Sequence, residues 1–121
     1  MNQQQYSACI KACTECAVAC NQCAMGCLQS NDMTTMANCL ALCIDCAQVC
    51  QVAAALMARG SRHAQALCAL CAEICATCAD ECAKSQVAGC QECAQACRRC
   101  VDECRKMSQQ SSSSGAKATV A

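Results

Sequence analysis

Twenty of the 121 residues are cysteines, and these thiols are the side chains through which the chain can do chemistry. Within each of four clusters, successive cysteines are separated alternately by three and four positions. Residues with this spacing share one face of a helix, whereas a strand would repeat every second position. The sequence therefore predicts one sulfur-lined seam on each of four helices. The clusters are Cys9, Cys13, Cys16, Cys20, Cys23 and Cys27; Cys39, Cys43, Cys46 and Cys50; Cys68, Cys71, Cys75, Cys78 and Cys82; and Cys90, Cys93, Cys97, Cys100 and Cys104.

Thiolates are soft ligands, and they select soft ions such as Cu(I), which accepts two or three sulfurs. Cysteines four positions apart on a helix have Cβ atoms about 6 Å apart, so both sulfurs can bind one ion. Only Cys68 and Cys90 lack such a C-x3-C partner. All twenty cysteines are thus candidate Cu(I) ligands. A lumen that holds many ions predicts storage, and neutralisation of every thiolate predicts about one Cu(I) per Cys.

Other uses of the thiols remain open at this point. Zinc can bind four thiolates from different helices. An iron–sulfur protein of the common bacterial type would carry C-x2-C-x2-C-x3-C-P, which is absent because the chain contains no proline. A thiol redox sensor is expected to have one or two activated cysteines rather than twenty similar ones. An enzyme is not predicted, because the single histidine forms no recognisable catalytic arrangement.

Residues between the clusters indicate where the helices begin and end. Asp32 and Ser61 are suitable N-caps, Gly60 is a suitable C-cap, and Ser85 can cap the last helix. Such short connections make neighbouring helices antiparallel. The predicted fold is all-α, an antiparallel up-down-up-down four-helix bundle with a cysteine-lined core. We expect helices at 3–29, 33–59, 62–84 and 86–107, which form one domain at 1–107, and a disordered Ser-rich tail at 108–121.

Charge and hydropathy exclude several partners. Nine basic and nine acidic residues give a formal net charge of +0, which leaves no excess basic charge for nucleic acid. No uninterrupted apolar stretch approaches the roughly eighteen residues expected of a membrane helix. The first residues carry neither the basic region nor the apolar run of an export signal. A cytoplasmic protein without nucleic-acid or membrane partners is expected.

Soft side chains also lie beyond the cysteines at both ends of the predicted bundle. Met33 and Met36 precede the second cluster, beside the first and third loops. A thioether can pass Cu(I) inward, although methionine also commonly fills the end of an apolar seam. His63 lies in the second loop, at the opposite end. Met33, Met36 and His63 are therefore candidate residues for metal uptake. The seam positions near His63 are occupied by Tyr6, Met57 and Met107.

The first two predicted helices carry apolar residues on the side that faces away from the cysteines. A monomer would leave these residues exposed to water. The last helix has charged residues at its outward positions instead. A homo-oligomer that uses the first two helices is predicted. The outward apolar residues are Val18, Met25, Ala41, Ile44, Val52 and Ala55.

Repeated C-x3-C-x2-C segments extend over residues 6–107, beginning with Cys9-Ile-Lys-Ala-Cys13-Thr-Glu-Cys16. This pattern resembles the bacterial copper storage proteins, whose four-helix bundles have cores lined with cysteines. The resemblance implies that the C-x3-C pairs bind Cu(I) and that the chain assembles as a homotetramer. It also implies one open and one closed end of the bundle. Because no export signal is recognised, the chain looks like the cytosolic branch of that family.

Overall fold

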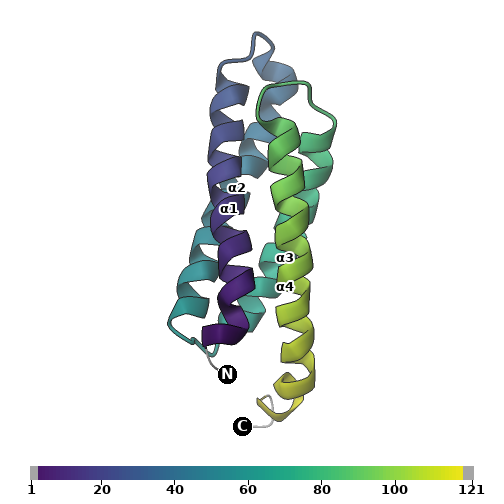
Figure 1. The fold of residues 1–121 in the computed structure, drawn as a ribbon. Coiled ribbons are helices and arrows are strands. Elements are labelled where there is room, and N and C mark those ends of the chain that lie inside the picture. The colour runs from purple at the N-terminus through teal and green to yellow at the C-terminus, as the bar shows by residue number, and fades with distance from the viewer. Residues whose placement is uncertain (1–2, 119–121) are drawn as a thin grey trace.

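The computed structural model describes the backbone of residues 3–118 and the side chains of residues 5–109. Its helices are α1 (Gln3–Leu28), α2 (Met33–Ala58), α3 (Ala64–Ala83) and α4 (Cys90–Ala118). Each helix packs against its neighbours in the cyclic order α1, α2, α3, α4 (Figure 1). The predicted antiparallel four-helix bundle is confirmed.

Two of the predicted helix boundaries follow from the expected capping residues. The Asp32 carboxylate accepts a hydrogen bond from the backbone N–H of Thr35 at 3.2 Å, which caps α2. At the other end of α2, Gly60 has a φ of 67°, a conformation that glycine adopts without strain. The N–H of Ser61 then donates to the carbonyl of Leu56 at 2.9 Å. These contacts fix the first and second loops.

The other two proposed caps, Ser61 and Ser85, stabilise turns instead of helix starts. The Ser61 hydroxyl accepts from the N–H of His63, and α3 begins at Ala64 rather than at residue 62. The Ser85 hydroxyl accepts from the N–H of Val87, and α4 begins at Cys90 rather than at residue 86. Gly89 has a φ of 89°, and the N–H of Cys90 donates to the carbonyl of Val87 at 3.1 Å, so a turn precedes the helix.

The last helix continues beyond residue 107, where the sequence suggested a disordered tail. Figure 1 shows α4 extending past the end of the bundle at which α1 begins. The helix ends at Ala118, and no proline interrupts it because the chain has none. Residues 119–121, the end of the expected tail, lie outside the described residues.

The core consists chiefly of cysteine and alanine. Every cysteine is at most 2% exposed, and no polar or charged side chain is buried among residues 5–109. Alanines such as Ala53 and Ala94 lie between the seams and allow the helices to approach closely. Close packing extends to the third loop, where a Cβ at Gly26 would lie 2.5 Å from the carbonyl oxygen of Ala88. The bundle therefore surrounds a continuous, narrow column of sulfur.

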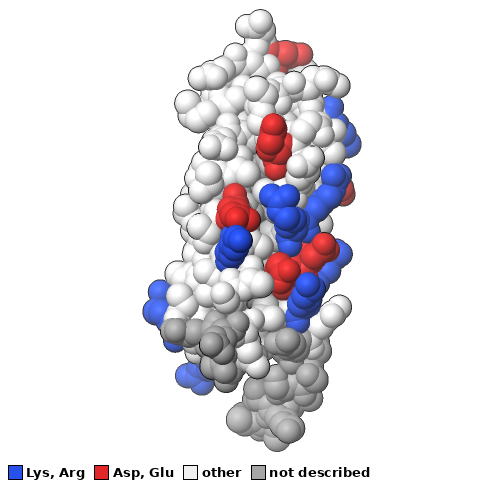
Figure 2. Space-filling model, in the orientation of Figure 1, with Lys and Arg blue, Asp and Glu red and all other residues white. Residues whose placement is uncertain are grey.

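By length and composition, α2 could cross a membrane. Its most apolar stretch has a mean hydropathy of 1.8, but only 39% of that stretch is buried within the chain. A core helix of a water-soluble bundle has the same properties, and α2 contributes Cys39, Cys43, Cys46 and Cys50 to the sulfur column. Charged side chains gather mainly over α4 on the face shown in Figure 2, whereas α2 exposes the apolar side chains of Met33, Ile44 and Val52 to water.

Candidate metal centre

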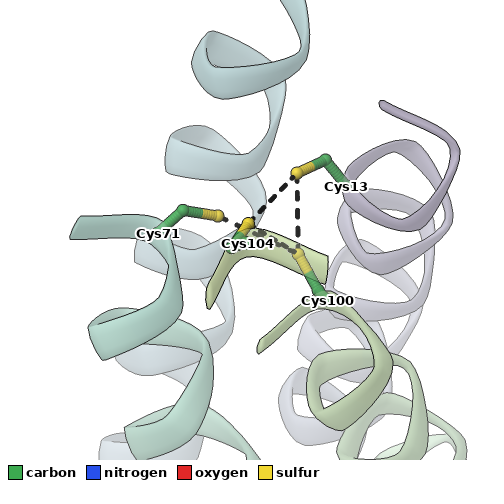
Figure 3. Close-up of side chains that lie close together, drawn as sticks. All are labelled: Cys13, Cys71, Cys100 and Cys104. Carbon is green, nitrogen blue, oxygen red and sulfur yellow. Dashed lines mark hydrogen bonds between the residues drawn. The ribbon is translucent and has the colours of Figure 1, made fainter. Parts of the chain in front are cut away.

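Cysteines from different helices converge into groups that can each hold a metal ion. Figure 3 shows Cys13 of α1, Cys71 of α3, and Cys100 and Cys104 of α4 with their sulfurs directed toward one another. The Cys13 sulfur lies 3.6 Å from that of Cys100 and 3.8 Å from that of Cys104. All four sulfurs lie within 4.8 Å of one another. Small movements of the side chains would let them share a metal ion.

Similar groups follow one another along the column and have members in common. Their cysteines are all buried, and the sulfurs within each group lie within 4.8 Å of one another. Because neighbouring groups overlap, a cysteine is not reserved for one site and its sulfur can bridge two ions. Further groups are Cys16, Cys46, Cys50 and Cys75; Cys16, Cys20, Cys46 and Cys97; Cys20, Cys78, Cys93 and Cys97; and Cys23, Cys39, Cys43 and Cys82.

The shortest sulfur–sulfur contacts between helices are closer than those within the predicted C-x3-C pairs. On one helix, the sulfurs of Cys71 and Cys75 lie 3.7 Å apart. Between helices, the sulfur of Cys46 lies 3.2 Å from that of Cys75, and the sulfur of Cys23 lies 2.9 Å from that of Cys90. Cys90, which lacks a C-x3-C partner, therefore has a close neighbour on α1. Sequence spacing found the pairs along a helix but could not find these contacts across the column.

Burial keeps several of these thiols protonated. It raises the pKa of the Cys27 thiol to about 12 and also raises the pKa values of Cys39 and Cys90. Deeper in the column, hydrogen bonds from neighbouring thiols, foremost that of Cys100, hold the pKa of Cys16 below its ordinary value. No buried cationic side chain among residues 5–109 offsets a thiolate charge. A bound metal must therefore displace protons and supply the positive charge.

A small pocket reaches the sulfur column at the end that carries the first and third loops. It has a volume of about 80 Å³ and is lined by residues that include Met36, Cys39 and Ser85. The Ser85 hydroxyl donates to the Met36 sulfur at 3.8 Å, and Met33 is 38% exposed nearby at the start of α2. From the sequence, Ser85 is predicted only to cap the last helix. Its position three residues after Cys82 continues the seam spacing and could have identified it.

The opposite end of the column is closed by large side chains. Tyr6, Met57 and Met107 are buried there, and the sulfur of Cys68 lies 3.6 Å from that of Met57. His63 is exposed at the N-cap of α3, where its side chain makes no capping hydrogen bond. The structure therefore brings Met36 to the column but separates His63 from Met33 and Met36 by the length of the bundle.

The sequence profile of the copper storage proteins matches residues 2–109, which contain all twenty cysteines. The chain belongs to the copper storage protein family. This family is non-enzymatic, so the prediction that the chain is not an enzyme is confirmed. Among curated proteins, comparison of the sequences yields no match.

Solved copper storage proteins are similar to the chain over most of its length. The Cu(I)-bound copper storage protein BsCsp3 is 39% identical, with 86% of this chain and 98% of that chain covered and a TM-score of 0.82. The apo copper storage protein 3 of Bacillus subtilis is 40% identical, with 85% and 98% covered and a TM-score of 0.81. A cytosolic copper storage protein from Streptomyces lividans, with five coppers, is 34% identical, with 88% and 94% covered and a TM-score of 0.83.

Proposed function

We propose that all twenty cysteines are metal ligands and that the protein stores about one Cu(I) per Cys in its sulfur column. The overlap of the four-thiol groups supports this proposal most directly. Cys16, for example, belongs to one group with Cys50 and Cys75 and to another with Cys20 and Cys97. Sulfurs shared in this way suit a continuous chain of Cu(I) ions bridged by thiolates.

The charge of the column favours Cu(I) over zinc. A zinc ion bound by four thiolates leaves a net charge of about −2 at each site. Buried uncompensated charge costs several kcal/mol or more, and the described side chains offer no buried cation that would offset it. One Cu(I) per thiolate leaves the column neutral.

A competition titration tests the identity of the metal. Fully reduced protein is expected to retain Cu(I) in the presence of a strong Cu(I) chelator, because soft thiolates select the soft ion. Zinc should bind fewer times per chain and should be lost to a zinc chelator of moderate strength. Tight binding of about five zinc ions per chain, with easy removal of copper, would favour separate four-thiolate zinc sites instead.

We further propose that copper enters through the pocket at Met36. The pocket ends at Cys39, and Met36 offers a soft but weak ligand beside it, whereas Met57 and Met107 close the far end. The exposed thioether of Met33 is placed to deliver ions to this pocket. His63 lies at the closed end and has no role in this route.

Uptake kinetics test this route. Met36→Leu keeps an apolar side chain of similar volume but removes the sulfur, so it should slow the first phase of Cu(I) uptake severalfold without changing the final copper content. His63→Ala should leave both quantities unchanged. Stopped-flow measurement of copper transfer from a coloured Cu(I) complex provides the comparison. A slow phase caused by His63→Ala alone would place the route at the other end.

The chain is also proposed to form a homotetramer through α1 and α2, in the cytoplasm, with residues 1–107 as its storage unit. Exposed apolar side chains on these two helices support the assembly, among them Val18, Met25 and Ile44. The similar protein from Streptomyces lividans is cytosolic, which supports the location. Every cysteine lies before residue 107, which supports the limit of the storage unit.

A further inference from the structure

Almost every side of α2 carries apolar residues of its own. The other helices of the chain cover only part of this surface. Asp45 is the only charged residue between Met33 and Ala58. A helix that is apolar all round is normally buried on every side. Exposed apolar side chains of α2 lie both on the side of α1 and on the side of α3, for example Ile44 and Val52. The α1 side is already part of the proposed assembly, so the α3 side requires its own explanation.

A shallow apolar groove of about 320 Å³ runs between α2 and α3. Val52 and Leu70 line it and are 49% and 45% exposed. The two side chains lie at about the same height in the bundle, because the sulfur of Cys50 contacts that of Cys71 at 3.6 Å. An apolar surface centred on Val52 and Leu70 is thus open to water. We call it the α2–α3 groove, lined by Asp45, Gln48, Val49, Val52, Leu67, Leu70 and Ile74.

Charged residues of opposite sign lie on either side of Val52, one on α2 and one at the C-cap of α2. Asp45 precedes Val52 by seven residues, and Arg59 follows Val52 by seven residues. Seven residues make two helical turns, so all three fall on one stripe, with each charge about 10 Å from Val52. Asp45 and Arg59 are both exposed, and neither has an ion-pair partner within residues 5–109. If a second copy is rotated by 180° about Val52, the acidic end of its stripe lies opposite the basic end of the first.

We propose that the α2–α3 groove is an interface with a second copy of this chain, related by a two-fold axis near Val52. The axis places Leu70 of both copies at the centre and brings Asp45 opposite Arg59 of the partner subunit, twice per interface. An isologous interface requires this kind of surface, in which one patch complements itself. The opposite charges favour a second copy of the chain over a lipid surface, because a surface that binds lipid tails would be uncharged.

This inference rests on the proposed homo-oligomer but assigns a different surface. Ile44 and Val52 lie about 80° apart around α2, and Ile44 does not line the groove. Two separate isologous interfaces, one on the α1–α2 side and one at the α2–α3 groove, build a tetramer as a dimer of dimers. A ring with four-fold symmetry would use one interface whose two sides differ.

The masses of variants in analytical ultracentrifugation test the centre of the interface. Leu70→Glu should convert tetramers to dimers, because it buries charge at the two-fold axis. Ala69→Glu, which adds the same charge to the next residue outside the groove, should leave tetramers intact. Ile44→Glu should also give dimers, and its combination with Leu70→Glu should give monomers. Tetramers that persist in Leu70→Glu overturn the α2–α3 interface, whereas tetramers that persist in Ile44→Glu overturn only the α1–α2 interface.

Charge reversal tests the pairing. Asp45→Arg and Arg59→Asp should each weaken the tetramer by roughly tenfold in dissociation constant, because each places like charges opposite one another. The double variant should restore the tetramer. A double variant as weak as the single ones overturns the two-fold arrangement.

Copper content per chain should match the parent in every variant, so a failed assembly with full copper content is distinct from failed storage. A parent that is monomeric, or that sediments with lipid vesicles, overturns the interface and leaves storage intact.

Discussion

Reduced protein titrated with Cu(I) is expected to saturate near twenty ions per chain, one for each cysteine. If every ion took two private thiolates, about ten ions would fill the column and leave about ten buried negative charges, each costing several kcal/mol or more. Bridging by each sulfur removes this charge, and the overlapping groups around Cys16 and Cys20 place the sulfurs close enough for it. Isothermal titration and metal analysis of the filled protein measure the end point.

Proton release and cysteine variants separate the two ways of filling the column. Burial raises the pKa values of Cys27, Cys39 and Cys90, so these thiols are protonated at neutral pH and must lose their protons on binding. Copper affinity should therefore increase with pH below those pKa values, as protons compete less.

Joint replacement of Cys46 and Cys97 by Ala should remove roughly one ion per lost thiol if sulfurs bridge. A sharp end point near ten ions would show that the charge argument is wrong.

Filled protein is expected to unfold at a much higher temperature than the reduced apo protein. A ligand that binds only the folded state stabilises it by about 4 kcal/mol for one site at a free concentration a thousandfold above Kd. A domain of this size gains about 4 °C or more in Tm per kcal/mol, so even one such ion should raise Tm by about 15 °C. Copper that bridges Cys13 of α1 and Cys100 of α4 would also connect helices otherwise held by small side chains.

Scanning calorimetry of protein loaded with increasing copper measures this effect. Tm should rise progressively with copper content, and removal of the metal by a strong chelator under reducing conditions should return it to the apo value. Equal Tm values for apo and filled protein would contradict copper binding within the column. Apo protein kept reduced throughout is the matched control, since oxidised thiols would stabilise the bundle by another route.

The cysteine seams could be predicted because helical periodicity is a local property of the chain. Spacings of three and four residues place Cys9 to Cys27 on one face whatever α1 packs against, and Asp32 and Gly60 end their helices through contacts within a few residues. Four such seams with short connections leave few alternatives to a bundle with a shared lumen. Fold class and the full set of candidate ligands can thus be predicted from sequence spacing.

The details that depend on contacts between helices could not be predicted. Cys23 and Cys90 are distant in sequence, and their proximity depends on how far α1 and α4 slide past each other. Ser85 is predicted to cap a helix, but the chain turns between Ser85 and Cys90, and Ser85 lies beside Met36 at the pocket. Spacing also did not distinguish the two ends of the column. The difference arises from how tightly side chains such as Tyr6 fill one of them.

Because Tyr6, Met57 and Met107 close one end of the column, the proposed route through the pocket at Met36 would serve for release as well as for entry. On this route, ions that enter first and migrate toward Cys68 and Cys104 would lie behind those that enter later and would leave after the outer positions empty. Release should then be ordered in time, with a fast fraction near Cys39 and a slow fraction at depth. Partial demand for copper would be met from the most recently stored ions, while the oldest ions remain as a permanent filling of the core.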